Sequence, residues 1–154
     1  MRKILIAITL ASLGLSGCAK QAKVGNYLVN PLEVNQNKIA VDSVSQLIKV
    51  HPPAKTQLII SQKTTDNFGS SFVNELRKRG YSITETYIEN KKINNEKKNT
   101  TKNNTGIPIS YILDKFSDAN YYRVTINIGN QSISRLYENN NNTVIPAGYW
   151  VMKE

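Results

Sequence analysis

Residues 121–137 read YYRVTINIGNQSISRLY, and this stretch decides the fold of the chain. Apolar and polar residues alternate on both sides of Gly129-Asn130, with the period of two that is typical of half-buried strands. Gly-Asn between two such runs predicts a two-residue hairpin turn, and the turn fixes which residues face each other. The expected pairs are Ile128 with Gln131, Ile126 with Ile133, Val124 with Arg135 and Tyr122 with Tyr137 on one face, and Thr125 with Ser134 on the other. Because three of the four pairs keep apolar atoms on one face, we predict an antiparallel hairpin with that face buried.

The rest of the C-terminal half also predicts strands. Ile107, Ile109, Tyr111 and Leu113 recur at every second position, which indicates a strand, although short helical pieces near Asp114 are an alternative. We expect a turn at residues 117–120 and a loop at 139–142. Residues 143–145 and 149–151 are expected to add a last strand, with Pro146 and Gly148 between them.

The N-terminal half alternates helices with strands. A helix is expected over Gln36–Val50, with an apolar stripe and the pair Pro52-Pro53 to end it. The stripe consists of Ala40, Val44, Leu47 and Ile48. The run Leu58-Ile59-Ile60 predicts a buried strand within residues 56–61.

A second helix follows, with Thr65 or Asp66 as its N-cap. Phe68, Phe72, Val73 and Leu76 share one face, basic residues 77–79 suit the last turn, and Gly80 suits the C′ position. Residues 81–88 predict another strand.

The composition of residues 89–105 differs from the rest of the chain. This stretch is nearly all Lys, Asn, Thr and Glu, with Ile93 as its single apolar residue. It offers too little apolar surface to offset the entropy of ordering, so we expect a disordered loop. The predicted fold class is therefore α+β, with two helices packed on a mixed, mainly antiparallel sheet and a disordered polar loop inserted mid-domain.

The first eighteen residues have the features of an export signal. Arg2 and Lys3 precede an apolar run over residues 4–13, and Leu15-Ser16-Gly17-Cys18 follows. Ten residues of helix rise about 15 Å, which is too short to span a bilayer. Leu-Ser-Gly-Cys resembles the lipobox of bacterial lipoproteins, which implies cleavage between Gly17 and Cys18 and a diacylglycerol and an N-acyl chain on Cys18.

This interpretation divides the chain into three parts. Residues 1–17 are a lipoprotein signal peptide, residues 18–34 a lipidated flexible tether, and residues 35–154 a single α+β periplasmic domain. The chain has 20 basic and 11 acidic residues and a formal net charge of +9, which favours either anionic partners or a solubilising surface.

The sequence offers little material for catalysis. His51 is the only histidine, and it is expected to cap a helix end or to face water. With Cys18 acylated, no Cys/His pair remains and no metal-ligand spacing occurs. Asp114 and Asp118 are expected to be caps or turn formers instead of paired catalytic carboxylates. We expect no catalytic, cofactor or metal site, and the only bound groups are the lipids on Cys18.

Aromatic residues suggest one contact surface. Tyr121 and Arg123, with Tyr122 and Tyr137, come nearest to a nucleic-acid platform, but the last two are predicted on the buried face, so direct nucleic-acid binding is not expected. Tyr149-Trp150 either completes the core or presents an aromatic contact to a partner.

Several stretches in order along the chain resemble the conjugal transfer lipoprotein family TrbH. They are 38–47 with 52–56, 66–69 with 76–81 (Leu-Arg-Lys-Arg-Gly-Tyr), 111–114 with 118–125 (Asp-Ala-Asn-Tyr-Tyr-Arg-Val-Thr), and 146–151 (Pro-Ala-Gly-Tyr-Trp-Val). Residues 89–105 depart from the family, which has an Ala/Pro-rich stretch there.

The resemblance implies a structural lipoprotein of a conjugative type IV secretion (mating-pair formation) apparatus, with other core proteins of that apparatus as partners. Ala19 after the cysteine, in place of aspartate, is consistent with sorting to the outer membrane. We therefore expect a non-enzymatic protein on the periplasmic face of the outer membrane that assists channel assembly. The alternative is a free-standing envelope lipoprotein that binds peptidoglycan or lipopolysaccharide.

Overall fold

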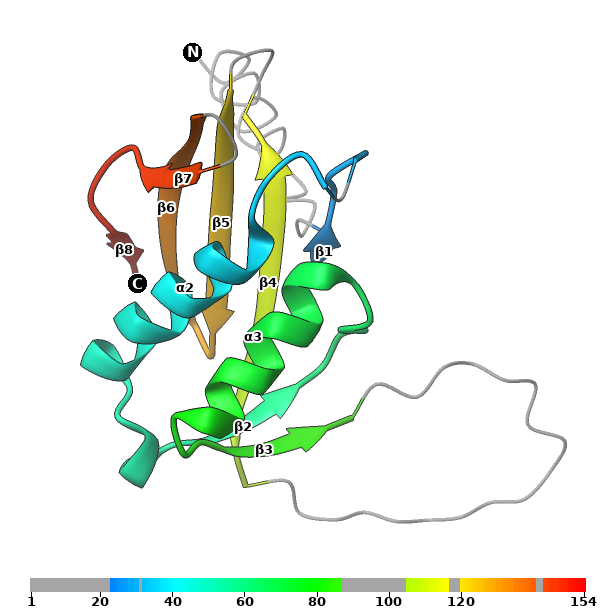
Figure 1. The fold of residues 1–154 in the computed structure, drawn as a ribbon. Helices are drawn as coiled ribbons and strands as arrows, with labels where there is room; N and C mark the ends of the chain where they lie inside the picture. Colours follow the sequence, from blue (N-terminus) through cyan, green and yellow to red (C-terminus); the bar gives the residue numbers. More distant parts are fainter. Residues whose placement is uncertain (1–22, 31, 87–104, 117–119, 141–142) are drawn as a thin grey trace, which may run out of the picture.

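The computed structural model describes residues 23–30, 32–86, 105–116, 120–140 and 143–154. Within these ranges two α-helices, a short 3-10 helix and eight strands form (Figure 1). In chain order they are β1 (Gly25–Asn26), α2 (Gln36–Val50), η1 (Pro53–Lys55), β2 (Gln57–Ile60), α3 (Asn67–Lys78), β3 (Ser82–Glu85), β4 (Ile107–Lys115), β5 (Tyr121–Ile128), β6 (Gln131–Asn140), β7 (Thr143–Pro146) and β8 (Val151–Lys153).

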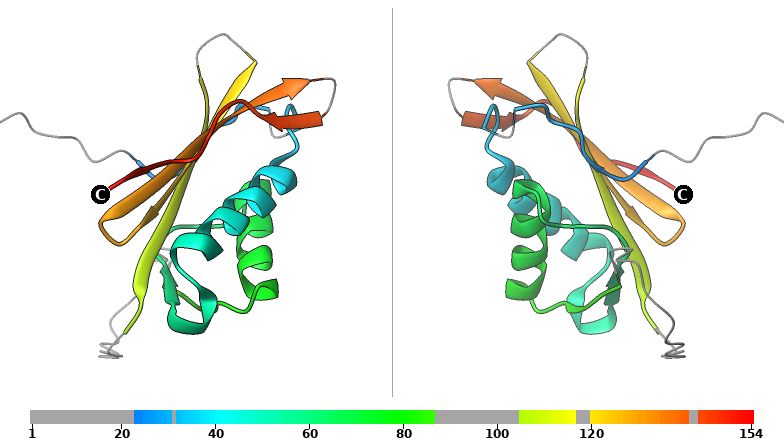
Figure 2. Two further views of the ribbon diagram at one scale, coloured as in Figure 1. Left: turned by 90° about the vertical axis from the view of Figure 1, so that its left-hand side faces the viewer. Right: turned by 90° about the vertical axis from the view of Figure 1, so that its right-hand side faces the viewer.

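The strands form one open, mixed sheet in the order β3-β2-β4-β5-β6-β7. β2 is parallel to both β3 and β4, whereas β4 to β7 pair antiparallel. β1 lies parallel to β4, and β8 lies antiparallel to β6. Both helices pack on the same face of the sheet (Figure 2). The predicted α+β class is confirmed, while the insert expected to be disordered lies, apart from Thr105, outside the described residues.

The hairpin of β5 and β6 has the predicted register. Ile128 faces Gln131, Ile126 faces Ile133, Val124 faces Arg135, Tyr122 faces Tyr137 and Thr125 faces Ser134. Gly129 adopts φ of 59°, a left-handed conformation that glycine takes without steric cost. A local turn and an alternating pattern were therefore enough to fix this pairing.

The helices begin and end where their capping residues lie. The Asn35 side chain accepts a hydrogen bond from the Lys38 N–H at 3.0 Å, at the start of α2. Asp66, one of the two expected N-caps, accepts from the Gly69 N–H at 3.0 Å. Gly80 follows α3 with φ of 87°, as expected for the C′ position. The predicted bounds of α2 are confirmed.

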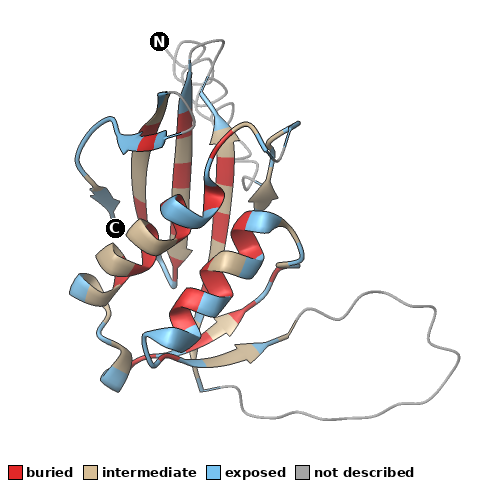
Figure 3. Ribbon diagram, in the orientation of Figure 1, coloured by how far each residue is buried: buried red, intermediate tan, exposed pale blue. Residues whose placement is uncertain are grey.

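The core fills the space between the helices and one face of the sheet (Figure 3). Apolar side chains from both layers are buried there, with the predicted helix stripes among them except for Ile48, which is only partly buried against the core. The main ones are Ile39, Ala40, Val44, Leu47, Phe68, Phe72, Leu76, Tyr111, Leu113, Tyr122, Val124, Ile126, Ile133 and Tyr137. Burial of this apolar surface is the main term that stabilises the fold.

The segment expected to be a flexible tether joins the fold at Gly25–Asn26 and again at Val34. Gly25 and Asn26 pair with β4, and Asn26 Nδ2 donates to Asp66 Oδ1 and to Gln36 Oε1, each at 2.9 Å. Val34 is buried in the core. The tether prediction for residues 18–34 is therefore wrong for this stretch, because amide and backbone hydrogen bonds hold it without any apolar periodicity.

Three smaller differences concern strand ends. Asp114 lies within β4 and not at a cap, turn or helical piece, because it forms an ion pair with Arg123 across the strand pair. Asn139 and Asn140 continue β6 where a loop was expected, since β7 pairs with them. Residues 143–145 and 149–151 were expected to add a last strand, but they belong to two strands, β7 and β8, that pair with different parts of β6; β8 begins only at Val151.

Candidate functional site

Within the described residues, helices cover one face of the sheet and leave the other uncovered. Alternation along β4, β5 and β6 places half of their side chains on the uncovered face, which we call the open face. It consists of Ser110, Ile112, Asp114, Arg123, Thr125, Asn127, Ser132, Ser134 and Leu136, all of intermediate exposure. These side chains are partly accessible, so the open face is available for contact with another molecule.

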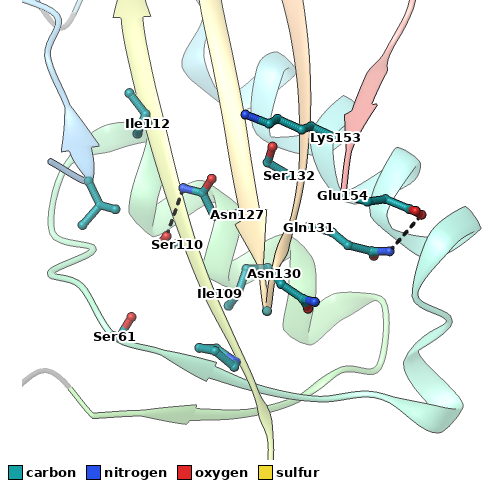
Figure 4. A pocket seen from close by; sticks show the side chains of 13 residues that line it. Ser61, Ile109, Ser110, Ile112, Asn127, Asn130, Gln131, Ser132, Lys153 and Glu154 are labelled. Atoms are coloured by element: carbon teal, nitrogen blue, oxygen red, sulfur yellow. Dashed lines mark hydrogen bonds between the residues drawn. The ribbon is translucent and has the colours of Figure 1, made fainter. Parts of the chain in front are cut away.

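One half of the open face is a polar groove of about 490 Å³ (Figure 4). Asn127 Nδ2 donates to Ser110 Oγ at 3.3 Å, and Gln131 Nε2 donates to Glu154 Oε1 at 3.3 Å. Ser61, Asn130, Ser132 and Lys153 also line it. The groove offers neutral hydrogen-bonding groups with a single cation and a single anion.

The other half is an apolar groove of about 390 Å³ beside β8. Its walls include Phe116, Leu136, Tyr149 and Val151. Arg123 also lines it and donates to Asp114 through Nε at 3.1 Å and Nη2 at 2.5 Å. The hydrogen bond with Asp114 raises the pKa of Arg123, so this residue keeps its charge. Aromatic rings beside a paired guanidinium are typical of protein contact surfaces.

The predicted contact residues, Tyr149 and Trp150, have different environments. Tyr149 is 93% exposed and lines the apolar groove. Trp150 is partly buried against the core, and its ring lies 5.8 Å from the Arg135 guanidinium. Tyr149 is thus available to a partner, whereas Trp150 mainly packs within the protein. Whether either residue contacts a partner stays a prediction.

His51 lies at a helix end, as the sequence predicted. It is the C-cap of α2, and its carbonyl accepts a hydrogen bond from Tyr81 Oη at 2.6 Å. Its Nε2 lies 3.1 Å from Gln131 Oε1. These contacts join the end of α2 to the sheet and give His51 a structural role.

The aromatic residues considered as a nucleic-acid platform are divided between the two faces. Tyr122 and Tyr137 are buried under the helices, as predicted, while Tyr121 is 37% exposed. Gly17, Cys18 and Asp118 lie outside the described residues. Among the residues that are described, no group of three His, Cys, Asp or Glu side chains is arranged to hold a metal ion.

Two buried tyrosine–aspartate pairs were not predicted. Tyr111 Oη donates to the Asp66 carboxylate, and Tyr137 Oη donates to Asp42 Oδ2 at 2.6 Å. Burial first, and the aspartate hydrogen bond second, raise the pKa of both tyrosines, so they stay protonated as donors. One signal was visible in the sequence: Arg135 falls on the predicted buried face, and a cation there needs an anionic partner.

The helices of the described part are too short or too polar to cross a membrane. Comparison with curated proteins and with solved structures found no match. The family model of the conjugal transfer protein TrbH matches residues 21–154, which is most of the chain and includes the sheet, both helices and Tyr149. The chain therefore belongs to the TrbH family of conjugal transfer proteins.

Proposed function

We propose that this conjugal transfer protein is a structural lipoprotein of a conjugative type IV secretion apparatus. Lipids on Cys18 anchor it in the outer membrane, and the folded part lies on the periplasmic side. There it assists assembly of the transfer channel by contacting other core proteins. The single observation that carries the proposal is the family match over residues 21–154.

The leader supports the anchoring part of the proposal. Leu15-Ser16-Gly17-Cys18 follows an apolar run of signal-peptide length, and Cys18 is the only cysteine in the chain. Two or more acyl chains hold a protein firmly on a bilayer, whereas one chain holds it weakly. An anchored protein also meets its partners at a raised local concentration, so that individually weak contacts suffice for assembly.

The apolar groove beside β8 supports the contact part of the proposal. Tyr149, Phe116 and Val151 are 93%, 48% and 63% exposed, and all three line this groove. Exposed apolar side chains gathered on one face are typical of surfaces that bind another protein. The TrbH family is one of conjugal transfer proteins and not a known enzyme family. We therefore assign this surface to binding a core protein of the apparatus.

The anchor is tested by Cys18→Ser, with Gly17→Ala as a matched control that keeps a small residue at the cleavage site. We expect Cys18→Ser to lose lipid labelling and to leave the membrane fraction, and plasmid transfer to fall. Gly17→Ala is expected to behave like the parent. A Cys18→Ser protein that stays in the membrane fraction and supports normal transfer would refute the proposed anchor.

The partner is tested by purification of the full-length protein in mild detergent from cells that carry the apparatus. Co-purification with core proteins, lost in Tyr149→Ala, is the expected result. Retention on cell-wall sacculi or lipopolysaccharide without any protein partner would instead support a free-standing envelope lipoprotein. That outcome would overturn the assembly role and direct attention to the polar groove.

A further inference from the structure

Arg135 joins three parts of the fold through one side chain. It lies on β6, where Nη1 donates to Asp42 Oδ2 of α2 at 2.9 Å. Its Nε donates to the Gly148 carbonyl at 2.7 Å, and its guanidinium lies 5.8 Å from the centre of the Trp150 ring. The side chain is 18% exposed. One guanidinium therefore ties the helix layer to the connection between β7 and β8.

Asp42 is itself fixed by a second donor. Tyr137 Oη donates to the same carboxylate oxygen at 2.6 Å, and Tyr137 is 1% exposed. Because burial raises the pKa of Tyr137, this hydroxyl remains a donor at neutral pH. The carboxylate that orients Arg135 thus has little freedom to move.

Tyr149 lies between the two points that Arg135 holds. The Gly148 carbonyl precedes it and the Trp150 ring follows it, and the flanking chain is fixed as well. Ala147 N–H donates to the Leu136 carbonyl at 2.9 Å, and Val151 pairs with Ser134 in the sheet. The Tyr149 side chain is nevertheless 93% exposed. An exposed aromatic ring is thus mounted on a fixed backbone.

We propose that Arg135 is the positioning residue that presents Tyr149 to a protein partner, an inference that rests on the contact surface proposed above. A fixed backbone lowers the entropy lost when a partner binds, so a ring on a fixed backbone binds more tightly than one on a mobile backbone. The planar guanidinium is required because it donates in two directions while its charge lies over an indole ring at 5.8 Å from the ring centre. Lysine would keep the charge and could still reach Asp42, but it cannot also hold Gly148 and Trp150.

The test is Arg135→Lys in the full-length protein, with Arg79→Lys as the matched control. Arg79 also donates through Nε to a carboxylate, that of Glu75 at 2.7 Å, but on α3. Trp150 is the only tryptophan in the chain, so its fluorescence reports directly on this segment. We expect Arg135→Lys to shift Trp150 emission and to increase hydrogen exchange at residues 147–150. Arg79→Lys is expected to change neither.

Co-purification then distinguishes the positioning role of Arg135 from the direct contact made by Tyr149. We expect Tyr149→Ala to weaken capture of core proteins about tenfold or more, and Arg135→Lys about threefold to tenfold. Unchanged fluorescence and exchange in Arg135→Lys would overturn the positioning role, as would normal capture by a loosened segment. If Tyr149→Ala captures partners normally, the proposed contact surface fails and presentation to a partner fails with it, even where fluorescence shows that Arg135 holds the segment.

Discussion

Gly69, in the first turn of α3, is the position where a single methyl group should be most damaging. A Cβ built there would overlap the Tyr111 hydroxyl and would lie 2.8 Å from the Thr64 Cα and 2.9 Å from Asp66 Oδ2. Real Cβ atoms essentially never approach other atoms this closely. Because Thr64 contributes a backbone atom, side-chain rotation alone cannot make room, and the Tyr111–Asp66 hydrogen bond must also yield.

Helix propensity predicts the opposite sign for Gly69→Ala. Alanine is favoured over glycine inside a helix by about 1 kcal/mol. Overpacking costs about 1–3 kcal/mol, and loss of a hydrogen bond to a charged group about 1.5–3 kcal/mol. We therefore expect the free energy of unfolding to fall by about 1.5–5 kcal/mol, with Tm roughly 10 °C lower.

Urea unfolding followed by circular dichroism measures this change, and Tyr111→Phe locates its cause. The phenylalanine removes the hydroxyl that the new methyl group strikes and the hydrogen bond that would be lost, so Gly69→Ala should cost about 1.5–3 kcal/mol less in that background. Gly148→Ala is the matched control, since nothing lies within 4 Å of its added Cβ. A Gly69→Ala protein as stable as the parent would refute the packing described for this turn.

Three further predictions concern stability. Burial raises the pKa of Tyr81 to about 12 from an ordinary 10. The folded state should therefore keep its full stability below pH 10 and lose part of it as the pH rises towards 12, because Tyr81 then ionises. Absorbance titration measures this pKa, and the free energy of unfolding of Tyr81→Phe should lack this loss across the same range. Ile126→Ala should cost about 2–5 kcal/mol by leaving a cavity under the helices, whereas Thr125→Ala on the open face should stay within about 1 kcal/mol; equal losses in urea unfolding would contradict the assignment of faces. Gly129→Ala should lower the free energy of unfolding by about 1–2 kcal/mol, because φ at this position is 59°. An unchanged midpoint of thermal unfolding in this variant would contradict the turn conformation.

Local signals in the sequence were enough where a structure depends on neighbouring residues. Gly129-Asn130 and the alternation around it gave the hairpin pairing residue by residue. Asp66 and Gly80 likewise marked the ends of α3. Each of these depends on a turn or a cap that a few adjacent residues form by themselves.

Contacts between distant segments were the ones that the sequence did not reveal. Gly25–Asn26 has no apolar periodicity and is ordered by pairing with Ile112 and Leu113, far along the chain. Asn139-Asn140 has the composition of a loop, yet β7 holds it in a strand. The position of Tyr149 depends on Arg135 and on Asp42, which are separated by 93 residues. In the sequence, only the position of Arg135 on the predicted buried face indicated that it pairs with an acidic residue.

The pairing of β1 with β4 limits how far the folded part can lie from a bilayer. Seven peptide steps separate Cys18 from Gly25, and they extend to about 25 Å at most. With acyl chains on Cys18, that edge of the sheet would stay within one small-domain diameter of the lipid headgroups. If the proposed anchor holds, a subunit that binds this protein would have to reach a domain tethered this closely to the bilayer.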